Sequence, residues 1–165
     1  IKKVDLRLNK LQLLPTETAK FHSLEHITHM DIRENDVVDL DIRAIRCLEY
    51  LNCKHNNLKS LQVNGASLRN LFASHNYLQT FVVSPKPEWI VKLNISHNKL
   101  TELPNWLPDC FFLVHLDVRH NQLTALPDRL FTDAKRLKIL KANHNRLTSL
   151  PEKIRTDTLE ELHLQ

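Results

Sequence analysis

The chain has 165 residues, of which 42% are hydrophobic and 25% charged, and its formal charge is +4 at pH 7. This balance is typical of a folded globular chain rather than a disordered one. No apolar run reaches the roughly 20 residues that cross a bilayer, so no direct membrane insertion is expected. The basic residues form no Lys/Arg block, which favours a solvated basic surface over nucleic-acid binding.

The numbers and positions of the cysteines and glycines exclude several kinds of functional site. The three cysteines are an odd number, and none forms a pair with metal-ligand spacing, which favours a reducing compartment such as the cytoplasm. The single glycine, Gly65, excludes glycine-rich loops that cradle phosphates. No motif for nucleophilic or two-metal chemistry is present. We therefore expect no catalytic residue, no cofactor and no metal ligand in these 165 residues.

A short pattern recurs along the whole chain, L-x-x-L-x-L-x-x-N-x-L, where L stands for any apolar residue. One copy begins at Leu113, continues through the pair Leu116 and Val118 to Asn121, and closes with Leu123. Seven copies are complete, and an eighth begins at residues 159–164. The spacing between successive asparagines runs from 20 to 26 residues, which is typical of leucine-rich repeats.

Each copy predicts one short strand, because the two middle apolar residues are two apart and point to the same face. In chain order these pairs lie at residues 4 and 6, 30 and 32, 51 and 53, 71 and 73, 93 and 95, 116 and 118, 140 and 142, and 162 and 164. The predicted fold class is an α/β solenoid. It is a leucine-rich-repeat horseshoe with a parallel sheet on its concave face and mostly irregular or 3-10 convex segments.

The connections between strands carry two further signals. The asparagine after each strand is predicted to bond backbone groups that stacking would otherwise bury unpaired, forming an asparagine ladder. Its members are Asn9, Asn35, Asn56, Asn76, Asn98, Asn121 and Asn145. Leu-Pro pairs such as Leu126-Pro127 stop strand continuation. Only residues 16–23 and 128–136 are expected to hold a helical turn or two.

Histidines precede the ladder asparagine in five successive copies: His55, His75, His97, His120 and His144. One interpretation is a metal site or a pH sensor, since imidazole titrates near pH 6.5. The interpretation that we favour is ordinary repeat composition at the strand's end, with each ring exposed and independent. No carboxylate or thiolate accompanies the column.

The concave face offers the candidate binding residues: Tyr50, Phe72, Lys92, Arg119 and Lys141. Tyr50 and Phe72 fall on adjacent predicted strands, and interfaces favour aromatic side chains and arginine near their centres. The alternative is that these aromatics only pack against each other across the sheet. Trp89 and Trp106 lie outside the strand pattern and are expected to cover the convex core, with a binding role as the alternative.

Several irregular pieces of the chain resemble one particular family. They are Leu48–Cys53, Leu61–Gly65, Leu71–Asn76, the insertion Pro85-x-Pro87, and Leu103–Trp106. Together they resemble the leucine-rich repeats of the PH-domain leucine-rich-repeat protein phosphatases, over roughly residues 45–165. The resemblance implies repeats between a pleckstrin-homology domain and a metal-dependent serine/threonine phosphatase domain that acts on growth-signalling kinases. The family's catalytic residues and divalent metal would lie in that absent phosphatase domain. Ras-scaffold proteins and adenylyl cyclases have repeats of similar style.

These observations predict one leucine-rich-repeat domain over residues 1–165, opening and stopping inside a repeat and hence part of a longer array. The predicted function is protein interaction or scaffolding in signalling, as the recognition arm of a multidomain phosphatase with protein partners such as signalling kinases. The alternative is a purely structural spacer between neighbouring domains. We expect a cytoplasmic location, with membrane or nuclear association left to the absent domains.

Overall fold

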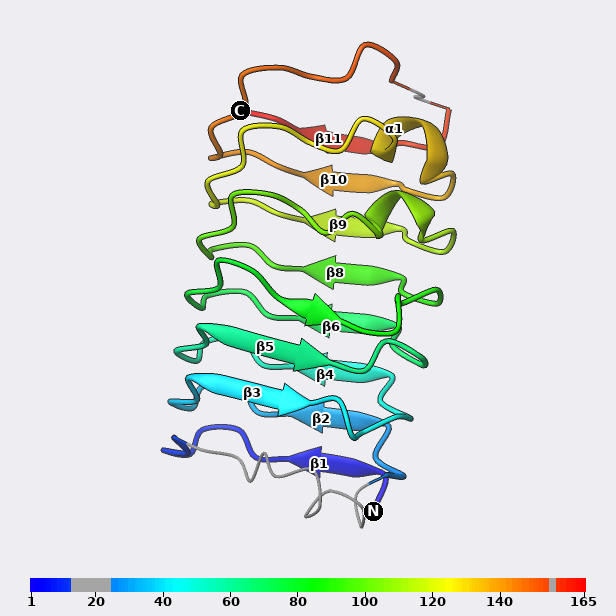
Figure 1. Ribbon diagram of the computed structural model, residues 1–165. Coiled ribbons are helices and arrows are strands. Elements are labelled where there is room, and N and C mark those ends of the chain that lie inside the picture. Colours follow the sequence, from blue (N-terminus) through cyan, green and yellow to red (C-terminus); the bar gives the residue numbers. More distant parts are fainter. Residues whose placement is uncertain (13–24, 155–156) are drawn as a thin grey trace.

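The computed structural model describes residues 1–12, 25–154 and 157–165, and its main feature is a tall parallel sheet (Figure 1). The strands of this eight-stranded sheet are β1 (Lys3–Asp5), β2 (His29–Asp31), β4 (Tyr50–Asn52), β6 (Asn70–Phe72), β8 (Lys92–Asn94), β9 (His115–Asp117), β10 (Ile139–Lys141) and β11 (Glu161–His163). They lie side by side in that order. All are parallel and in register, one strand from each copy of the repeat. The predicted fold class is confirmed.

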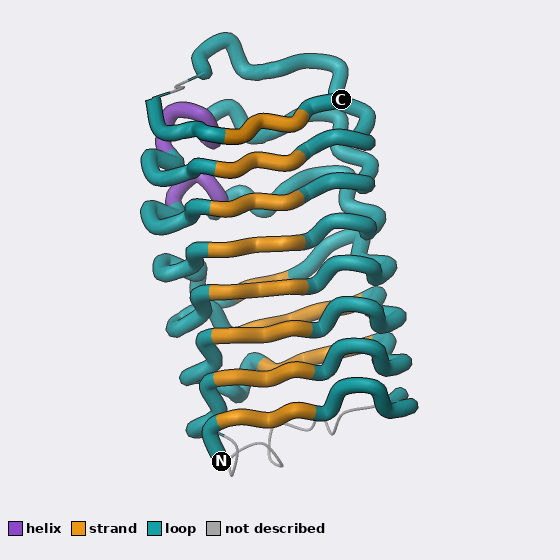
Figure 2. The backbone as a smooth tube through the Cα atoms, turned by 180° about the vertical axis from the view of Figure 1, so that it is seen from behind, coloured by secondary structure: helices purple, strands orange, loops and turns teal. Residues whose placement is uncertain are grey.

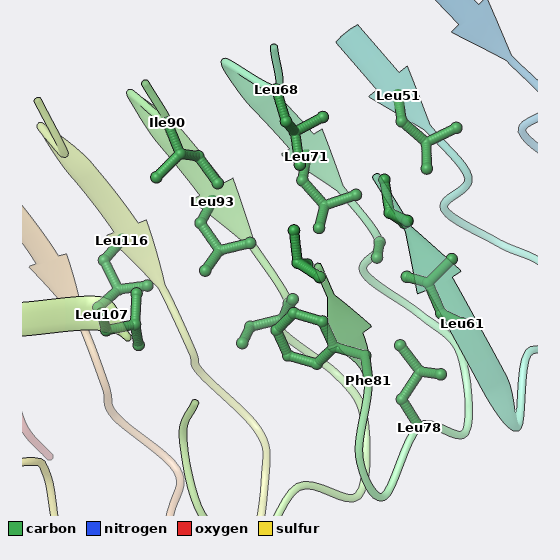
Figure 3. Close-up of a cluster of buried hydrophobic side chains, with 14 of the residues drawn as sticks. Leu51, Leu61, Leu68, Leu71, Leu78, Phe81, Ile90, Leu93, Leu107 and Leu116 are labelled. Atoms are coloured by element: carbon green, nitrogen blue, oxygen red, sulfur yellow. The ribbon is translucent and has the colours of Figure 1, made fainter. Parts of the chain in front are cut away.

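The core lies behind this sheet and consists of the repeated apolar positions. Leu71 and Leu93, at the centres of β6 and β8, are fully buried and extend toward the side on which Phe81 and Leu61 lie (Figure 3). Each such leucine stabilises the fold by roughly 1.5–3 kcal/mol relative to an exposed side chain. Cys53 shares this core, and burial raises the pKa of its thiol to about 12, which keeps the thiol protonated and unreactive.

A second, smaller sheet on the convex side was not predicted. It consists of β3 (Asp39–Ile42), β5 (Ser60–Val63) and β7 (Val82–Val83), again parallel. Figure 2 shows these strands behind the eight of the large sheet. Apolar residues alternate with polar ones in β3 and β5, so that Leu40 and Leu61 face the core while Asp41 and Gln62 face outward.

In the described part of the chain, helical structure is short and lies on the convex side of the later repeats. A 3-10 turn, η2, spans Leu107–Asp109, and one helical turn, α1, spans Leu130–Asp133. The α1 turn falls within the predicted 128–136 region, whereas the predicted helical segment 16–23 lies outside the described residues. Arg129 joins the two turns, because its guanidinium contacts Asp109 at 2.7 Å and Asp133 at 2.7 Å.

The asparagine ladder runs along the edge at which the strands end, and Asn98 is a representative member. The side-chain NH₂ group of Asn98 donates to the carbonyl oxygens of Ala73 in the preceding repeat, at 3.0 Å, and of Ile95 and Ser96 in its own repeat. Its amide oxygen accepts from the backbone N–H of Leu78, at 3.0 Å. One buried side chain therefore closes its own turn and fastens it to the repeat before.

A proline-bounded insertion replaces the usual convex closure after β7. Its Ser84–Pro85 peptide bond is cis, and the insertion passes directly over Gly65. A Cβ atom at Gly65 would lie 2.1 Å from the carbonyl oxygen of Pro85 and 2.7 Å from a methyl carbon of Val83. The only glycine of the chain is thus required by the close approach of two backbone segments.

Replacing Asn98 by alanine tests the ladder. The substitution leaves the Leu78 N–H buried without its partner and removes bonds to three carbonyl oxygens, each of which keeps another donor. We therefore expect a loss of about 2 kcal/mol in the free energy of unfolding, measured by urea titration. Asn9→Ala is the matched control, because Asn9 is exposed and, among the residues that the structure describes, its side chain bonds only to the carbonyl oxygens of Leu6 and Arg7 in its own turn. Its loss should stay below about 1 kcal/mol. Equal losses in the two variants would contradict the role given to the inter-repeat bonds.

Candidate functional site: the concave face

The outward side chains of the eight-stranded sheet form three columns that cross all its strands. The first column is the first residue of each strand, the second is the last, and the third lies two residues farther along. Because the strands pair in register, each column places side chains from neighbouring repeats next to one another. We call this surface the concave face. It brings together residues that lie about 20 positions apart in the sequence.

An aromatic run crosses the N-terminal half of the concave face. The ring of His29 stacks on the ring of Tyr50 with centroids 5.6 Å apart, and Tyr50 contacts Phe72 at 5.6 Å with a 58° tilt. All three rings are half-buried, so each keeps part of its surface in solvent. The aromatics do pack against each other across the sheet, and they also remain accessible.

Carboxylates on the concave face are paired with arginines two residues later in the sequence. The clearest pair is Asp117 with Arg119: the arginine donates to both carboxylate oxygens, at 2.9 and 2.8 Å. Asp5 with Arg7 and Asp31 with Arg33 repeat this arrangement. Hydrogen bonding to Asp117 is the main cause that raises the pKa of Arg119, which keeps the guanidinium charged and fixed in place.

A small hollow of about 150 Å³ lies beside the aromatic run, lined by Phe72, Lys92, Leu93, Asn94 and His115. Phe72 forms one wall, and Leu93 belongs to the core. Burial lowers the pKa of His115, and the positive charges of Lys141 and Lys92 lower it further. At neutral pH the hollow therefore combines an apolar wall, a neutral imidazole and a lysine ammonium.

The structure brings three of the five candidate residues together. Tyr50 and Phe72 are in contact, and Phe72 and Lys92 line the same hollow. Lys141 lies two strands beyond, on β10, where it faces Asp117 across the sheet. Arg119 lies at the end of β9, but its guanidinium is committed to Asp117. Whether these residues bind a partner stays a prediction.

The histidine column is a continuous stack along the edge at which the strands end. Successive rings from His55 to His144 have centroids 4.1 to 4.3 Å apart and interplanar angles of 11 to 15°. All five residues have positive φ, between 53 and 59°, a region in which histidine is enriched. The expectation of independent rings is therefore wrong. The turn geometry selects the residue type, and the repeat spacing then stacks the rings.

The stack is poorly arranged for chelation. The lone pairs of imidazole lie in the ring plane, so stacked rings direct them side by side rather than toward one point. Across residues 1–12, 25–154 and 157–165, no group of three or more His, Cys, Asp or Glu side chains is placed to hold a metal ion. In the same part of the chain, no helix has the length and apolarity needed to cross a membrane.

Sequence reasoning missed an aromatic cluster at the edge where the strands begin. Trp89 stacks on Phe112 at 5.2 Å, Phe111 meets Phe112 edge-on, and the Arg136 guanidinium lies over both phenylalanine rings at 4.6 and 4.9 Å. Trp89 is 50% exposed, so the expectation that it covers the convex core is wrong. The sequence does contain a signal for this cluster: Trp89, Phe112 and Arg136 each directly precede the first apolar position of their repeat, so stacking of the repeats brings them together.

The other tryptophan behaves as expected. Trp106 is partly buried against the convex core and meets Phe81 edge-on, with ring centroids 6.2 Å apart. Its place between Leu103 and η2 gives it the covering role that was predicted for both tryptophans.

Comparison with known proteins supports both the repeat type and the family resemblance. The Leucine Rich Repeat family profile matches residues 89–110. The PH domain leucine-rich repeat protein phosphatase 1 of Rattus norvegicus is 40% identical over 107 residues, which is 65% of this chain. The protein phosphatase PHLPP-like protein of Drosophila melanogaster is 38% identical over 88 residues, or 52% of the chain. These segments are 6% and 9% of the two relatives.

Solved structures agree on the fold. A leucine-rich-repeat protein of Leptospira interrogans aligns with all of this chain at a TM-score of 0.84 and 27% identity, using 43% of its own length. The chain is a leucine-rich-repeat solenoid, and the predicted resemblance to the repeat region of the PH-domain leucine-rich-repeat phosphatases is confirmed.

The histidine stack predicts a pH-dependent stability. Burial is the largest cause that lowers the pKa of His75, His97 and His120, and neighbouring positive charges add to it. Around and below pH 6.5, the unfolded chain, with histidine pKa values near 6.5, binds more protons than the folded chain. The free energy of unfolding therefore falls as pH drops below about 6.5. Urea titrations at pH 7.5, 6.5 and 5.5 measure this loss.

A double variant, His75→Asn with His97→Asn, keeps a side chain suited to positive φ and should show a smaller decline with pH. The control His26→Asn changes an exposed residue outside the stack and should retain the wild-type decline. A double variant as pH-sensitive as the wild type would refute the stack's contribution.

Proposed function

We propose that this leucine-rich-repeat solenoid is a protein-recognition segment and that its concave face binds the partner. The observation that carries the proposal is the accessible aromatic run of His29, Tyr50 and Phe72, which continues into the hollow beside Lys92. Aromatic side chains supply large contact areas with little loss of conformational freedom, and they dominate the energetics of many interfaces.

The rigidity of the concave face supports the same proposal. Tyr50, Phe72 and Lys92 stand on strands that are bonded on both sides within the sheet, and the asparagine ladder fixes the turns at its edge. Tyr50 and Phe72 also restrain each other through ring contact. A partner that docks here meets a surface that is already ordered, so little entropy is lost on binding.

The family resemblance supports a role within a larger phosphatase. The rat and fly relatives are named as protein phosphatases, and the matched segments are a small part of each. We propose that the solenoid is the recognition arm of a multidomain serine/threonine phosphatase in signalling, with protein partners such as signalling kinases. Catalysis and its divalent metal would then belong to a separate domain, in a cytoplasmic parent.

Alanine substitution of Tyr50 and Phe72 tests the concave face. The proteins that the wild-type chain captures from a cell extract are identified by mass spectrometry, and each is then measured for binding to the purified variants. Loss of two central aromatic anchors should weaken binding by about 30-fold or more, since each anchor contributes at least about 1 kcal/mol. Circular dichroism checks that the variants remain folded.

The matched control replaces Val82, an exposed residue of the convex sheet, by alanine. This variant should bind as the wild type does. If the aromatic variants retain full binding and the convex variant loses it, the concave face is not the site. If no protein binds specifically, the alternative of a structural spacer is favoured.

A further inference from the structure

The charges of the concave face are unevenly satisfied within the molecule. Of its four carboxylates, Asp5, Asp31 and Asp117 each form an ion pair with the arginine two residues later. The fourth, Glu161, lies 3.5 Å from His163. Asp117 is the most deeply placed, with its side chain 3% exposed. These carboxylates are therefore engaged before any partner arrives.

Across residues 1–12, 25–154 and 157–165, the lysines of the same surface form no such ion pair. The cations of the concave face are Lys3, Arg7, Arg33, Lys54, Lys92, Arg119 and Lys141. Within the described residues, no carboxylate lies within 4.0 Å of the ammonium group of any of its four lysines. The arginines are thus ion-paired with the carboxylates, whereas the lysines carry positive charges that no described carboxylate balances.

Two of these lysines flank the hollow and act on one shared neighbour. Lys92 lines the hollow on β8, and Lys141 stands on β10, with His115 of β9 between them. Both ammonium groups help to lower the pKa of His115, after the larger effect of burial, so their charge is felt at this point. The strands that carry Lys92 and Lys141 are two strand spacings, or about 10 Å, apart. An anionic group bound between these lysines would be attracted by both.

The apolar wall of the hollow adds a second requirement. Phe72 closes the side opposite His115, and beyond it the aromatic run continues through Tyr50 to His29. A ligand whose negative charge pairs with the lysines can therefore also contact the aromatic side chains on the next two strands. An extended segment with a carboxylate side chain close to an apolar side chain would complement both parts of this surface.

We infer that the concave face between β4 and β10 binds an acidic peptide segment, with a carboxylate side chain at Lys92 and Lys141 and an apolar side chain on Phe72 and Tyr50. This inference rests on the proposed protein-recognition function and specifies the chemistry of the partner. A longer polyanion fits less well, because nucleic acid or a lipid surface laid along the face would also meet Asp5 and Asp31.

Fluorescence anisotropy of a labelled synthetic peptide tests the inference. The probe alternates glutamate with leucine and serine, and its counterpart carries lysine in place of each glutamate. The glutamate peptide should bind at least tenfold more tightly than its counterpart and should weaken as salt rises, because screening shortens the range of the attraction to about 8 Å at physiological ionic strength. Equal binding of the two peptides would overturn the inference.

Lysine variants locate the site. Lys92→Gln and Lys141→Gln should each weaken binding of the glutamate peptide by about fivefold, within the range measured for partly exposed charge pairs. Lys59→Gln, an exposed lysine outside the concave face, should leave binding unchanged. If Lys92→Gln and Lys141→Gln bind as tightly as the wild type, the lysines are not the site.

Two further outcomes separate this inference from the proposed function. Duplex DNA and phosphatidylserine vesicles are titrated in place of the peptide, and binding of either that depends on Lys92 and Lys141 more than peptide binding does would overturn the acidic-peptide assignment. If captured proteins need Tyr50 and Phe72 but not the two lysines, the inference fails while the concave-face function stands. If captured proteins bind the aromatic variants and the lysine variants as tightly as the wild type, both the inference and the concave-face function fail.

Discussion

The asparagine ladder is the interaction on which the rest of this solenoid depends. A single amide side chain offers two donors and an acceptor, and each ladder asparagine from Asn35 onward uses them on backbone groups of its own repeat and of the one before. The turns would otherwise bury carbonyl and N–H groups without partners, at about 1–3 kcal/mol for each. By closing those turns, the ladder lets every repeat present its strand at the same height and in the same register.

The concave face follows from this regular stacking. When strands align in register, residues of successive repeats, about 20 positions apart in the chain, become neighbours, as Tyr50 does with Phe72 and Lys92 with His115. The same regularity produces the histidine stack, because a turn that favours positive φ selects similar residues at a fixed spacing. A binding site in such a fold is therefore assembled from side chains of different repeats, not from one continuous segment. The unpaired lysines Lys92 and Lys141 of the concave face are an example.

Periodicity made the large sheet and its core predictable. The apolar pairs, such as Leu116 with Val118, recur with the asparagine at a fixed offset, and every such pair from β2 to β10 is buried as the pattern requires. The convex sheet escaped prediction because its strands are two to four residues long and, within the described residues, recur in only three repeats. Their alternation of apolar and polar residues is visible in Asp39–Ile42 and Ser60–Val63, but so short a pattern has no clear signal.

The site was predictable in part for the same reason. Strand alternation placed Tyr50, Phe72 and Lys92 on one face, but it gave no information on ion pairing, so Arg119 was chosen although Asp117 engages it. The exposed Trp89 depends on contacts with Phe112, from the following repeat, and such contacts are not encoded in a single copy of the pattern.

The central claim is that partners reach this protein through the concave face. Site-specific photo-crosslinking measures this most directly, with a benzophenone side chain placed at Asn70 on β6 or at Gln62 on β5. Both residues are half-buried, outward-facing strand positions, one on the concave face and one on the convex sheet. We predict that captured proteins crosslink from position 70 and not from position 62. Crosslinking from position 62 alone would contradict the claim.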